Sequence, residues 1–572
     1  TIRMPQSFQV GLLQHDPTVG DVAGNLDRLE RQFDAAAQSG ADLVVTPELA
    51  VLGYPPRDLL HRNGVLAEQE AALQRLATLT EDGPAMIVGA ATESPAQSGP
   101  PLQNSAVVFA DGERRDRYAK RLLPTYDIFD EHRYFDPGTE PLTVDVDGVT
   151  VGVSICEDAW HDASITGKRR HGTNPLAELE AAGAELIVTL SASPFRLGKP
   201  QSRVTRFGAH AKDTGLPVVF ANQVGGNDDI IFDGNSLVLD REGDVLERLP
   251  AFEEAVRTVD PFGEIPVGSV SMRESRAGQA RQALRLGLRD YMAKTGFSDV
   301  IIGMSGGVDS TVATVLAVDA LGPDHVYGVS LPSTITSDQS IEDARAVADA
   351  LGIEFDVVPV GGAIETLEAS IESATGEVVD GLAAENIQAR ARGVVLMTLA
   401  NARNAFVLTP DNKSEAAVGY CTLYGDAVGA LAPLGDCYKT LVYDLADHYN
   451  DDPPVGSEPV IPERVIEKPP TAELREGQTD EDELPPYDQL DPVLKSYIHG
   501  QVTGADLRAE FPDHVVDEAL SRIARSEFKR WQTPPPLRIT GKSFDRGWKY
   551  PIAASYEAVL ERGEETMSAE TD

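Results

Sequence analysis

The sequence predicts an α/β protein of more than one domain, and three observations support this prediction. The chain has 572 residues, which at roughly 100–200 residues per domain argues for about two to four domains. Over the first ~260 residues, short apolar runs rich in β-branched residues alternate with polar stretches of helical period. A stretch rich in Gly, Pro and Ser follows between Asp260 and Arg276, and a second alternating series begins after it.

The first series predicts strands at SFQVGLL, ADLVVTPE, AMIVGAAT, SAVVFA, VTVGVSICED, ELIVTLSAS, LPVVFANQ and NSLVLD. Between the first two runs, Leu26, Leu29, Phe33 and Ala37 recur at helical spacing, and Gly40 can end that helix in a left-handed conformation. The chain therefore starts in the order strand, helix, strand, as α/β layers do.

The second series predicts strands at SDVIIGMS, HVYGVSLPS, FDVVPV and AFVLTPD, with helices between them. We place the first domain at residues 1–265, a linker at 266–280 and the second domain at 281–572. From Asn450 to Asp491 the chain is crowded with Pro and acidic residues, which predicts a long irregular arm. Such arms are usually lids, binding loops or linkers.

The charge balance restricts the classes of partner. There are 91 Asp and Glu against 49 Lys and Arg, a net charge of -42, and only 12 of the basic residues are Lys. We therefore expect no nucleic-acid and no membrane partner, and any anionic substrate must be held by local groups. The acidic excess suits a salty cytoplasm, where charge repulsion is screened.

Cysteine usage and hydropathy predict a cytoplasmic protein. Cys156, Cys421 and Cys437 are odd in number and widely spaced, which argues against a disulfide framework and favours a reducing compartment. No apolar run approaches the ~18 residues of a membrane span, and the first residues lack the layout of a signal peptide.

A first group of candidate catalytic residues lies at strand ends. Cys156 follows VTVGVSI, Glu48 ends ADLVVTPE, and Lys120 lies in YAKRLLPTYDIFDE. Taken singly, the Cys is more often a small buried hydrophobe and the two charges are more often solvated. Together they supply a thiol nucleophile, a base to take its proton and a cation to stabilise an oxyanion, with no His required.

The blocks TPELAVLGYPPRDLL, YAKRLLPTYDIFDEHRYFDPG and SICEDAW resemble the catalytic blocks of the nitrilase/amidase superfamily, in the version fused to glutamine-dependent NAD synthetases. Over residues 7–260 this resemblance implies a four-layer αββα sandwich. It implies Glu48 as general base, Lys120 as transition-state stabiliser and Cys156 as the nucleophile that forms a thioester and releases ammonia.

The same resemblance implies that glutamine is held by Tyr126, Ser193 and Lys199. Glu131 falls where the superfamily often has a second acid. A structural salt bridge is an equally good interpretation of Glu131.

A second group of candidate residues lies in IIGMSGGVDSTVATVLAVDAL, which predicts a strand, a glycine turn and a helix. Adjacent glycines let backbone N–H groups approach an anion, and the helix terminus adds partial positive charge. The loop lacks the Lys of a Walker A motif. It resembles the N-type ATP pyrophosphatase loop of a Rossmann-like parallel-sheet domain (adenine nucleotide alpha hydrolase), which cleaves ATP between the α and β phosphates. The implied ATP contacts are Gly303, Ser305, Gly306, Gly307, Asp309 and Ser310.

Later segments resemble successive blocks of the NAD synthetase family, namely residues 385–401, 412–446, 462–491 and EFKRWQTPPPLRITGKSFDRGWKYPI. The resemblance implies that Asp309 and Glu415 hold Mg²⁺. It also implies a loop at Thr471–Leu474 that closes over ATP, with Arg390 and Lys439 as phosphate partners. The implied deamido-NAD contacts are Asn386, Arg390, Glu415 and Lys529. Arg390 and Arg392 have a simpler interpretation as charges on a helix surface.

One position departs from the family pattern, which usually reads T-T-G-N-K-S-E. Here Pro410 replaces a Thr of the ATP site, and Asp411 replaces a Gly that can adopt a positive φ. The rest of the block is intact, so we interpret the change as local.

The two resemblances together imply a glutamine-hydrolysing NAD(+) synthase. ATP would adenylylate deamido-NAD and ammonia made at Cys156 would attack the adenylate, giving NAD, glutamate, AMP and diphosphate. Family resemblance also favours a homo-oligomer built on dimers. Two alternatives stay open, a different amidotransferase that uses the same loop and a non-enzymatic nucleotide sensor with a relict amidase. AMP and diphosphate release that depends on deamido-NAD would separate the three.

Overall fold

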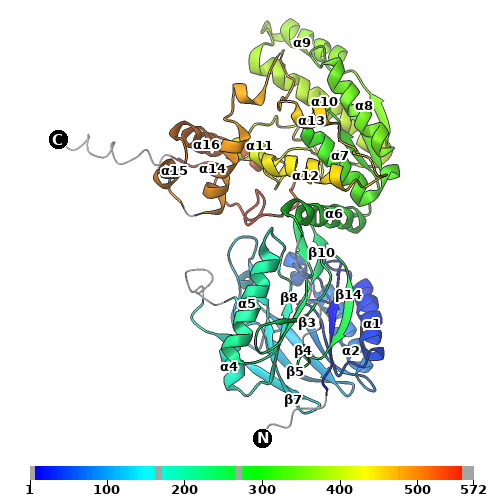
Figure 1. Cartoon of the computed structure of the whole chain (residues 1–572), viewed down its shortest axis with the longest axis vertical. Helices are drawn as coiled ribbons and strands as arrows, with labels where there is room; N and C mark the ends of the chain where they lie inside the picture. The colour runs from blue at the N-terminus through cyan, green and yellow to red at the C-terminus, as the bar shows by residue number, and fades with distance from the viewer. Residues whose placement is uncertain (1–6, 161–170, 265–273, 476, 501, 557–572) are drawn as a thin grey trace, which may run out of the picture. The chain divides into compact units, whose positions relative to one another are not determined.

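The computed structural model describes residues 7–160, 171–264, 274–475, 477–500 and 502–556. The chain divides into two compact units, Thr1–Glu274 and Ser275–Asp572 (Figure 1). Residues 266–273 of the predicted linker lie outside the described residues. Residues 276–280 belong to helix α6 (Arg276–Thr295), so this end of the predicted linker is helical.

Within its described residues the first unit contains two six-stranded sheets, ordered β14-β1-β2-β3-β4-β5 and β13-β12-β9-β8-β7-β6. The strands of the first sheet are β1 (Val10–Gln14), β2 (Leu43–Val45), β3 (Ala85–Glu93), β4 (Leu102–Ala110), β5 (Glu113–Ala119) and β14 (Ala255–Val259). Those of the second are β6 (Leu142–Val146), β7 (Val149–Ile155), β8 (Leu186–Ser191), β9 (Val218–Asn222), β12 (Leu237–Leu239) and β13 (Val245–Arg248). A separate hairpin consists of β10 (Val224–Asn227) and β11 (Ile230–Asp233).

The two sheets are packed face to face and each is covered by helices on its outer face. Leu12 of β1 packs with Val153 of β7 between the sheets, whereas the next residue, Leu13, packs with Phe33 of α1 on the outer side. Helices α1 (Val22–Gln38) and α2 (Asn63–Leu79) cover the first sheet, and α4 (Pro175–Ala181) and α5 (Lys199–Thr214) cover the second (Figure 1). The four-layer αββα sandwich implied by the sequence is confirmed.

The second unit is built on a parallel sheet with strand order β17-β16-β15-β18. Its strands are β15 (Val300–Gly303), β16 (Val326–Ser330), β17 (Glu354–Val357) and β18 (Phe406–Leu408). Strand order reverses beside β15, so the loops that follow β15 and β18 diverge. Such a switch point opens a crevice at the carboxyl edge of a parallel sheet. The predicted Rossmann-like domain is confirmed.

Helices cover both faces of this sheet and extend into a helical region near the carboxyl end (Figure 1). Near the sheet they are α7 (Val308–Leu321), α8 (Asp338–Leu351), α9 (Gly361–Thr375), α10 (Gly381–Arg403), α11 (Lys413–Val418), α12 (Lys439–Asp451) and α13 (Glu463–Glu467). The helical region contains α14 (Tyr487–His499), α15 (Gly504–Glu510), α16 (Asp513–Arg525) and α17 (Glu527–Arg530). None of the helices in the described part of the chain is long and apolar enough to cross a membrane.

Candidate active sites

A buried cluster of three charges lies in the first unit at the ends of β2 and β5. The Lys120 ammonium donates to Glu48 Oε1 at 2.7 Å and to Glu131 Oε1 at 2.8 Å. Both oxygens of Glu48 are held further, by Asn104 Nδ2 at 2.7 Å and by the backbone N–H of Ala192 at 3.0 Å. The Lys120 side chain is only 1% exposed, so the packed chain alone fixes this geometry.

The charges in this cluster stabilise one another. Burial alone would lower the pKa of Lys120, but the carboxylates of Glu131 and Glu48 raise it above its ordinary value, which keeps the ammonium charged. Burial raises the pKa of Glu131 to about 7, against the lowering effect of Lys120. Glu131 also accepts a hydrogen bond from the Tyr54 hydroxyl at 2.8 Å. Glu131 therefore forms a salt bridge and lies in the same cluster as Glu48.

Cys156 lies at the turn that follows β7 and is 6% exposed. Its φ of 43° is left-handed, a conformation that costs a non-glycine residue of order 1–3 kcal/mol and is common at active sites. Burial, and then the charge of Glu48, raise the pKa of the thiol, while Lys120 lowers it. The thiol is therefore protonated at rest and needs a base during attack.

Tyr126 contacts Glu157, the residue that follows Cys156. The Tyr126 hydroxyl donates to Glu157 Oε2 at 2.8 Å, and His171 Nε2 lies 3.0 Å from Glu157 Oε1. Sequence reasoning did not single out Glu157, although its place directly after Cys156 was a usable signal.

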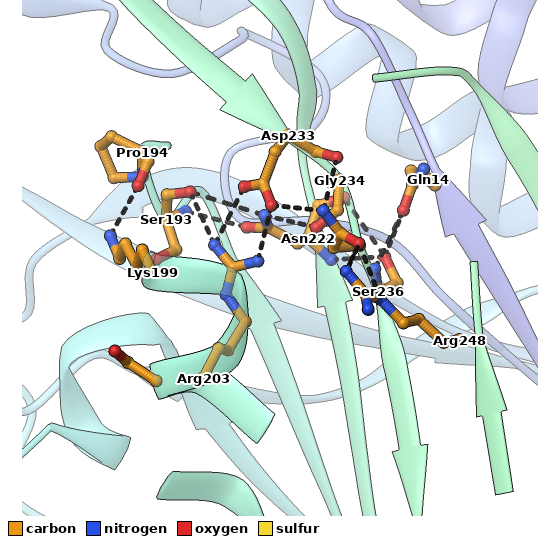
Figure 2. A network of polar contacts seen from close by, with 12 residues as sticks. Gln14, Ser193, Pro194, Lys199, Arg203, Asn222, Asp233, Gly234, Ser236 and Arg248 are labelled. Atoms are coloured by element: carbon orange, nitrogen blue, oxygen red, sulfur yellow. Dashed lines mark hydrogen bonds and ion pairs between the residues drawn. The ribbon is translucent and has the colours of Figure 1, made fainter. Parts of the chain in front are cut away.

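Ser193 and Lys199 lie beside a polar network at the base of α5, shown in Figure 2. The Lys199 ammonium donates to the carbonyl oxygen of Pro194 at 2.7 Å, and the backbone N–H of Ser193 donates to Asn222 Oδ1 at 2.9 Å. Burial, with the charges of Arg203 and Arg196, lowers the pKa of Lys199 to about 7. Lys199 thus sits where its proton can be lost near neutral pH.

A buried ion pair in the same network supports this segment. Arg203 makes two hydrogen bonds of 3.0 Å to the carboxylate of Asp233, and both side chains are fully buried. Figure 2 shows Arg203 pointing at the Asp233 carboxylate. Asn235 Nδ2 also donates to this carboxylate, at 2.6 Å. A two-point Arg–carboxylate pair has a fixed geometry, which suits a support for the Ser193 loop.

The second unit has a cavity of about 230 Å³ at the carboxyl ends of β15 and β18. Apolar side chains that line it include Met304, Val329, Leu331, Leu396, Leu408 and Val428. Five of the six predicted ATP contacts also line it, namely Gly303, Ser305, Gly307, Asp309 and Ser310. Gly306 is not among the lining residues. It has φ 79°, and a Cβ there would lie 2.4 Å from the carbonyl oxygen of Ser340, so it packs against α8.

Asp309 and Glu415 both accept a hydrogen bond from the same ammonium group, that of Lys439, in this cavity. Lys439 Nζ donates to Asp309 Oδ2 at 2.5 Å and to Glu415 Oε1 at 3.0 Å. Asn412 caps α11 and donates to Asp309 Oδ1 at 2.8 Å. Pro410 also lines the cavity, so the departure from the family pattern lies in its wall.

The cavity contains more acidic than basic side chains. Its carboxylates are Asp309, Asp411, Glu415, Glu473, Asp426 and Asp480, and its cations are Arg392, Lys439 and Lys468. Burial raises the pKa of Glu415 to about 8, against Lys439 and with the help of Asp309. Burial and the charge of Asp426 also raise the pKa of Asp411, which does not adopt a positive φ.

The donor set fits Mg²⁺ that arrives with a triphosphate. Mg²⁺ is usually held by one or two carboxylates together with phosphate oxygens and waters. Asp309 and Glu415 provide two such carboxylates. The described residues contain no group of three or more His, Cys, Asp or Glu that could hold a metal by themselves.

Three of the predicted deamido-NAD contacts converge on the segment 419–423. Thr422 Oγ1 donates to Asn386 Oδ1 at 2.8 Å, and Lys529 Nζ donates to the carbonyl oxygens of Gly419 and Cys421 at 2.7 Å each. Arg390 is exposed and donates to the carbonyl oxygen of Leu423 at 3.3 Å.

None of these three side chains lines the cavity, whereas Arg392 does. Arg392 Nε donates to the carbonyl oxygen of Leu331 at 3.1 Å. Sequence reasoning gave Arg390 the phosphate role and treated Arg392 as a surface charge. Arg392 and Lys468 are therefore cavity cations that sequence reasoning missed.

Comparison with known proteins identifies a family for each unit. Residues 9–261 match the family described as carbon-nitrogen hydrolase, and residues 280–533 match the family described as NAD synthase. The chain is 40% identical over 559 residues to the glutamine-dependent NAD(+) synthetase of Synechocystis sp., covering 96% of this chain and 99% of that protein. It is 37% identical over 591 residues to that of Thermotoga maritima, covering 97% and 100%.

Solved structures are similar over the whole chain. The glutamine-dependent NAD(+) synthetase of Acinetobacter baumannii in complex with ADP superposes with a TM-score of 0.75 at 35% identity, covering 96% of this chain and 98% of that one. The enzyme of Cytophaga hutchinsonii gives 0.81 at 19% identity, covering 97% and 99%, which supports the fold alone. The chain belongs to the family of glutamine-dependent NAD(+) synthetases.

Proposed function

We propose that this protein amidates deamido-NAD to NAD, using ATP and L-glutamine and releasing glutamate, AMP and diphosphate. The observation that carries the proposal is the presence in one chain of a buried Glu48–Lys120–Glu131 cluster beside Cys156 and of a glycine-loop cavity. The ADP-bound relative supports ATP as co-substrate. All three cysteines are unpaired, which supports a reducing, cytoplasmic location.

In the first site we assign Cys156 as the nucleophile and Glu48 as the base. Sγ attacks the side-chain amide carbon of glutamine while Glu48 takes the thiol proton, and Lys120 stabilises the oxyanion. The C–N bond then breaks, and the proton held by Glu48 goes to the leaving nitrogen as ammonia departs. Water hydrolyses the thioester on Cys156, with Glu48 again as base, and glutamate leaves. Tyr126, Ser193 and Lys199 orient the substrate.

In the second site the carboxylate of deamido-NAD attacks the α-phosphorus of ATP, and the bond to the β-phosphate breaks. Ammonia then attacks the acyl carbon, and AMP leaves with the electron pair of its bond. Adenylylation is required because a carboxylate oxygen is a poor leaving group. Loop amides around Gly303–Gly307 hold the phosphates, and the apolar wall near Leu396 suits the adenine. Mg²⁺ held by Asp309 and Glu415 would supply neutralisation of phosphate charge.

We also propose a dimer formed through α9 and α10. Apolar side chains on these helices are unusually exposed, namely Leu367, Ile371, Leu382, Val394 and Met397. At 3.6 residues per turn, Leu382, Val394 and Met397 fall on the same side of α10 as Asn386 and Arg390. Val394→Asp should therefore lower the mass measured by sedimentation, whereas an unchanged mass would place the contact elsewhere.

The experiment that tests the reaction measures AMP and diphosphate release with and without deamido-NAD. Release that requires deamido-NAD supports this function. Release that requires a different carboxylate would favour another amidotransferase, and binding of ATP without any release would favour a nucleotide sensor.

A further inference from the structure

Two side chains of the acidic, Pro-rich arm form a linked pair in the wall of the ATP cavity. Lys468 Nζ donates to Glu473 Oε1 at 2.8 Å and to the Ser340 hydroxyl at 2.8 Å. The Ser340 hydroxyl in turn donates to the same Glu473 oxygen at 2.5 Å. Lys468 and Glu473 both line the cavity and keep 26% and 20% of their side chains exposed. Both charges are therefore accessible to a ligand.

The pair lies next to the glycine loop. Gly306 packs so closely on α8 that a Cβ there would approach the carbonyl oxygen of Ser340 to 2.4 Å. The side chain of this same Ser340 accepts the hydrogen bond from Lys468. The ammonium of Lys468 is thereby placed beside the loop whose amides are suited to phosphate.

Glu473 pairs with Lys468, lines the same cavity as Arg392 and has an unfavourable backbone conformation. Its φ of 46° is left-handed, which a residue with a Cβ rarely adopts. Such conformations persist where surrounding contacts impose them, and they cluster at ligand clamps and switches. Burial lowers the pKa of Arg392, and the charges of Asp426 and Glu473 oppose that shift, so the guanidinium is within electrostatic reach of Glu473.

We propose that the Glu473 carboxylate occupies the place of a substrate phosphate, and that the diphosphate end of ATP displaces it as the partner of Lys468 and also binds Arg392, which lines the same cavity. The inference rests on the proposed function and adds two phosphate-binding side chains and one competing anion to it. A partly buried cation without a partner is costly, so an internal carboxylate stabilises the ligand-free cavity. In a cavity with surplus carboxylates, exchange of one anion for another also avoids adding net charge.

The alternative is that Lys468, Glu473 and Ser340 simply hold the arm against α8. The two accounts predict opposite signs for the near-isosteric change Glu473→Gln. If Glu473 competes with phosphate, loss of its charge strengthens phosphate binding. If it only fastens the arm, loss of its charge loosens the cavity wall and weakens binding.

The test measures dissociation constants by titration calorimetry on the full chain, with Mg²⁺ and without deamido-NAD. ATP and inorganic diphosphate are titrated separately. We expect Glu473→Gln to bind ATP, diphosphate or both roughly three- to tenfold more tightly, since close charge pairs and charged hydrogen bonds have effects of this order. Tightening with ATP alone would assign the contact to bound nucleotide, and tightening with diphosphate alone would assign it to the leaving group.

Four further variants define the effect. Lys468→Met should weaken binding roughly tenfold, and Lys468→Arg should restore most of it. Glu467→Gln removes the same charge from an exposed neighbour outside the cavity lining and should change binding less than about twofold. Glu473→Ala should shift binding in the same direction as Glu473→Gln.

Unchanged or weaker binding of both ligands by Glu473→Gln, with an unchanged unfolding midpoint, would overturn the inference. Failure of the proposed function would look different. In that case the unaltered protein would release no AMP in response to deamido-NAD, while the binding measurements on the variants could still be compared with each other.

Discussion

The two candidate sites differ in how completely the chain itself balances their charges. In the first unit one buried ammonium, Lys120, is shared by Glu48 and Glu131, and these side chains are at most 5% exposed. In the second unit Lys439 is shared by Asp309 and Glu415, whose side chains are 18% and 15% exposed, among further carboxylates. The first site is therefore preorganised by the chain alone, whereas the second keeps partly exposed carboxylates, whose charge the proposed complex of ATP with Mg²⁺ would balance.

The largest expected effect is the loss of glutamine use at the first site while the second site stays active. Cys156→Ala should reduce glutamine-driven NAD synthesis by roughly 1,000-fold or more, because no other group can form the thioester. Synthesis from ammonium salts should stay within about twofold, because the second site is untouched. Rates with each nitrogen source measure the difference, and Cys437→Ala, a buried thiol outside both sites, is the control. Loss of both rates in Cys156→Ala would contradict the separation.

Chelation of divalent metal should affect only the second site. With excess EDTA, AMP release should fall by roughly 100-fold, because phosphate charge faces the carboxylates of Asp309 and Glu415 without neutralisation. Glutamine hydrolysis, followed as glutamate formed, should not change, and added Mg²⁺ should restore AMP release. A metal requirement in the glutaminase assay would refute the comparison.

Removing the shared ammonium should destabilise the two units unequally. Lys120→Met leaves two buried carboxylates uncompensated and should cost about 3–5 kcal/mol in the free energy of unfolding. Lys439→Met should cost less, about 1–2 kcal/mol, because the more exposed carboxylates can take up protons or water. Urea unfolding can report each unit by fluorescence in variants that keep tryptophan in one unit only, since Trp160 lies in the first and Trp531 and Trp548 lie in the second. Equal losses would remove the distinction.

A smaller effect should appear in the pH dependence of glutamine use. Burial, Arg203 and Arg196 lower the pKa of Lys199 to about 7, so its ammonium loses a proton as pH rises through 7. If the charged form holds the substrate carboxylate, kcat/KM for glutamine should fall up to roughly tenfold per pH unit above 7. Lys199→Met should have a low value that no longer varies over this range. A wild-type profile that stays flat from pH 6 to 8 would exclude this role.

In the two six-stranded sheets, the strands that sequence reasoning found and those that it missed differ in burial. The eight predicted strands of the first unit are the interior strands of its two sheets, which are continuously apolar because both faces are covered. The missed strands of these sheets are β5, β6, β13 and β14, which lie at the sheet edges. The β10–β11 hairpin was also missed, although its residues are buried. The residues of β5, ERRDRYA, are mostly exposed and carry little apolar signal. In the second unit all four strands were predicted, including the edge strand β17, whose residues alternate between exposed and half-buried.

The site residues that could be predicted from the sequence also share one property. Residues inside contiguous motifs, such as Cys156 or the glycine loop, could be identified because one short segment carries the chemistry. Lys468 and Arg392 could not, because their role depends on the segments that the fold places beside them. Gly306 was predicted as an ATP contact from its motif, but it does not line the cavity. Its close packing on α8 explains why this position is a glycine.

The most direct test of the central claim follows the nitrogen atom. The unaltered protein is given glutamine labelled with ¹⁵N in its side-chain amide, together with ATP, Mg²⁺ and deamido-NAD, and the NAD formed is analysed by mass spectrometry. The account predicts ¹⁵N in the carboxamide of NAD, in step with AMP release, and none when Cys156 is replaced by Ala. Unlabelled NAD, or ¹⁵N recovered only as ammonium with no NAD formed, would contradict it.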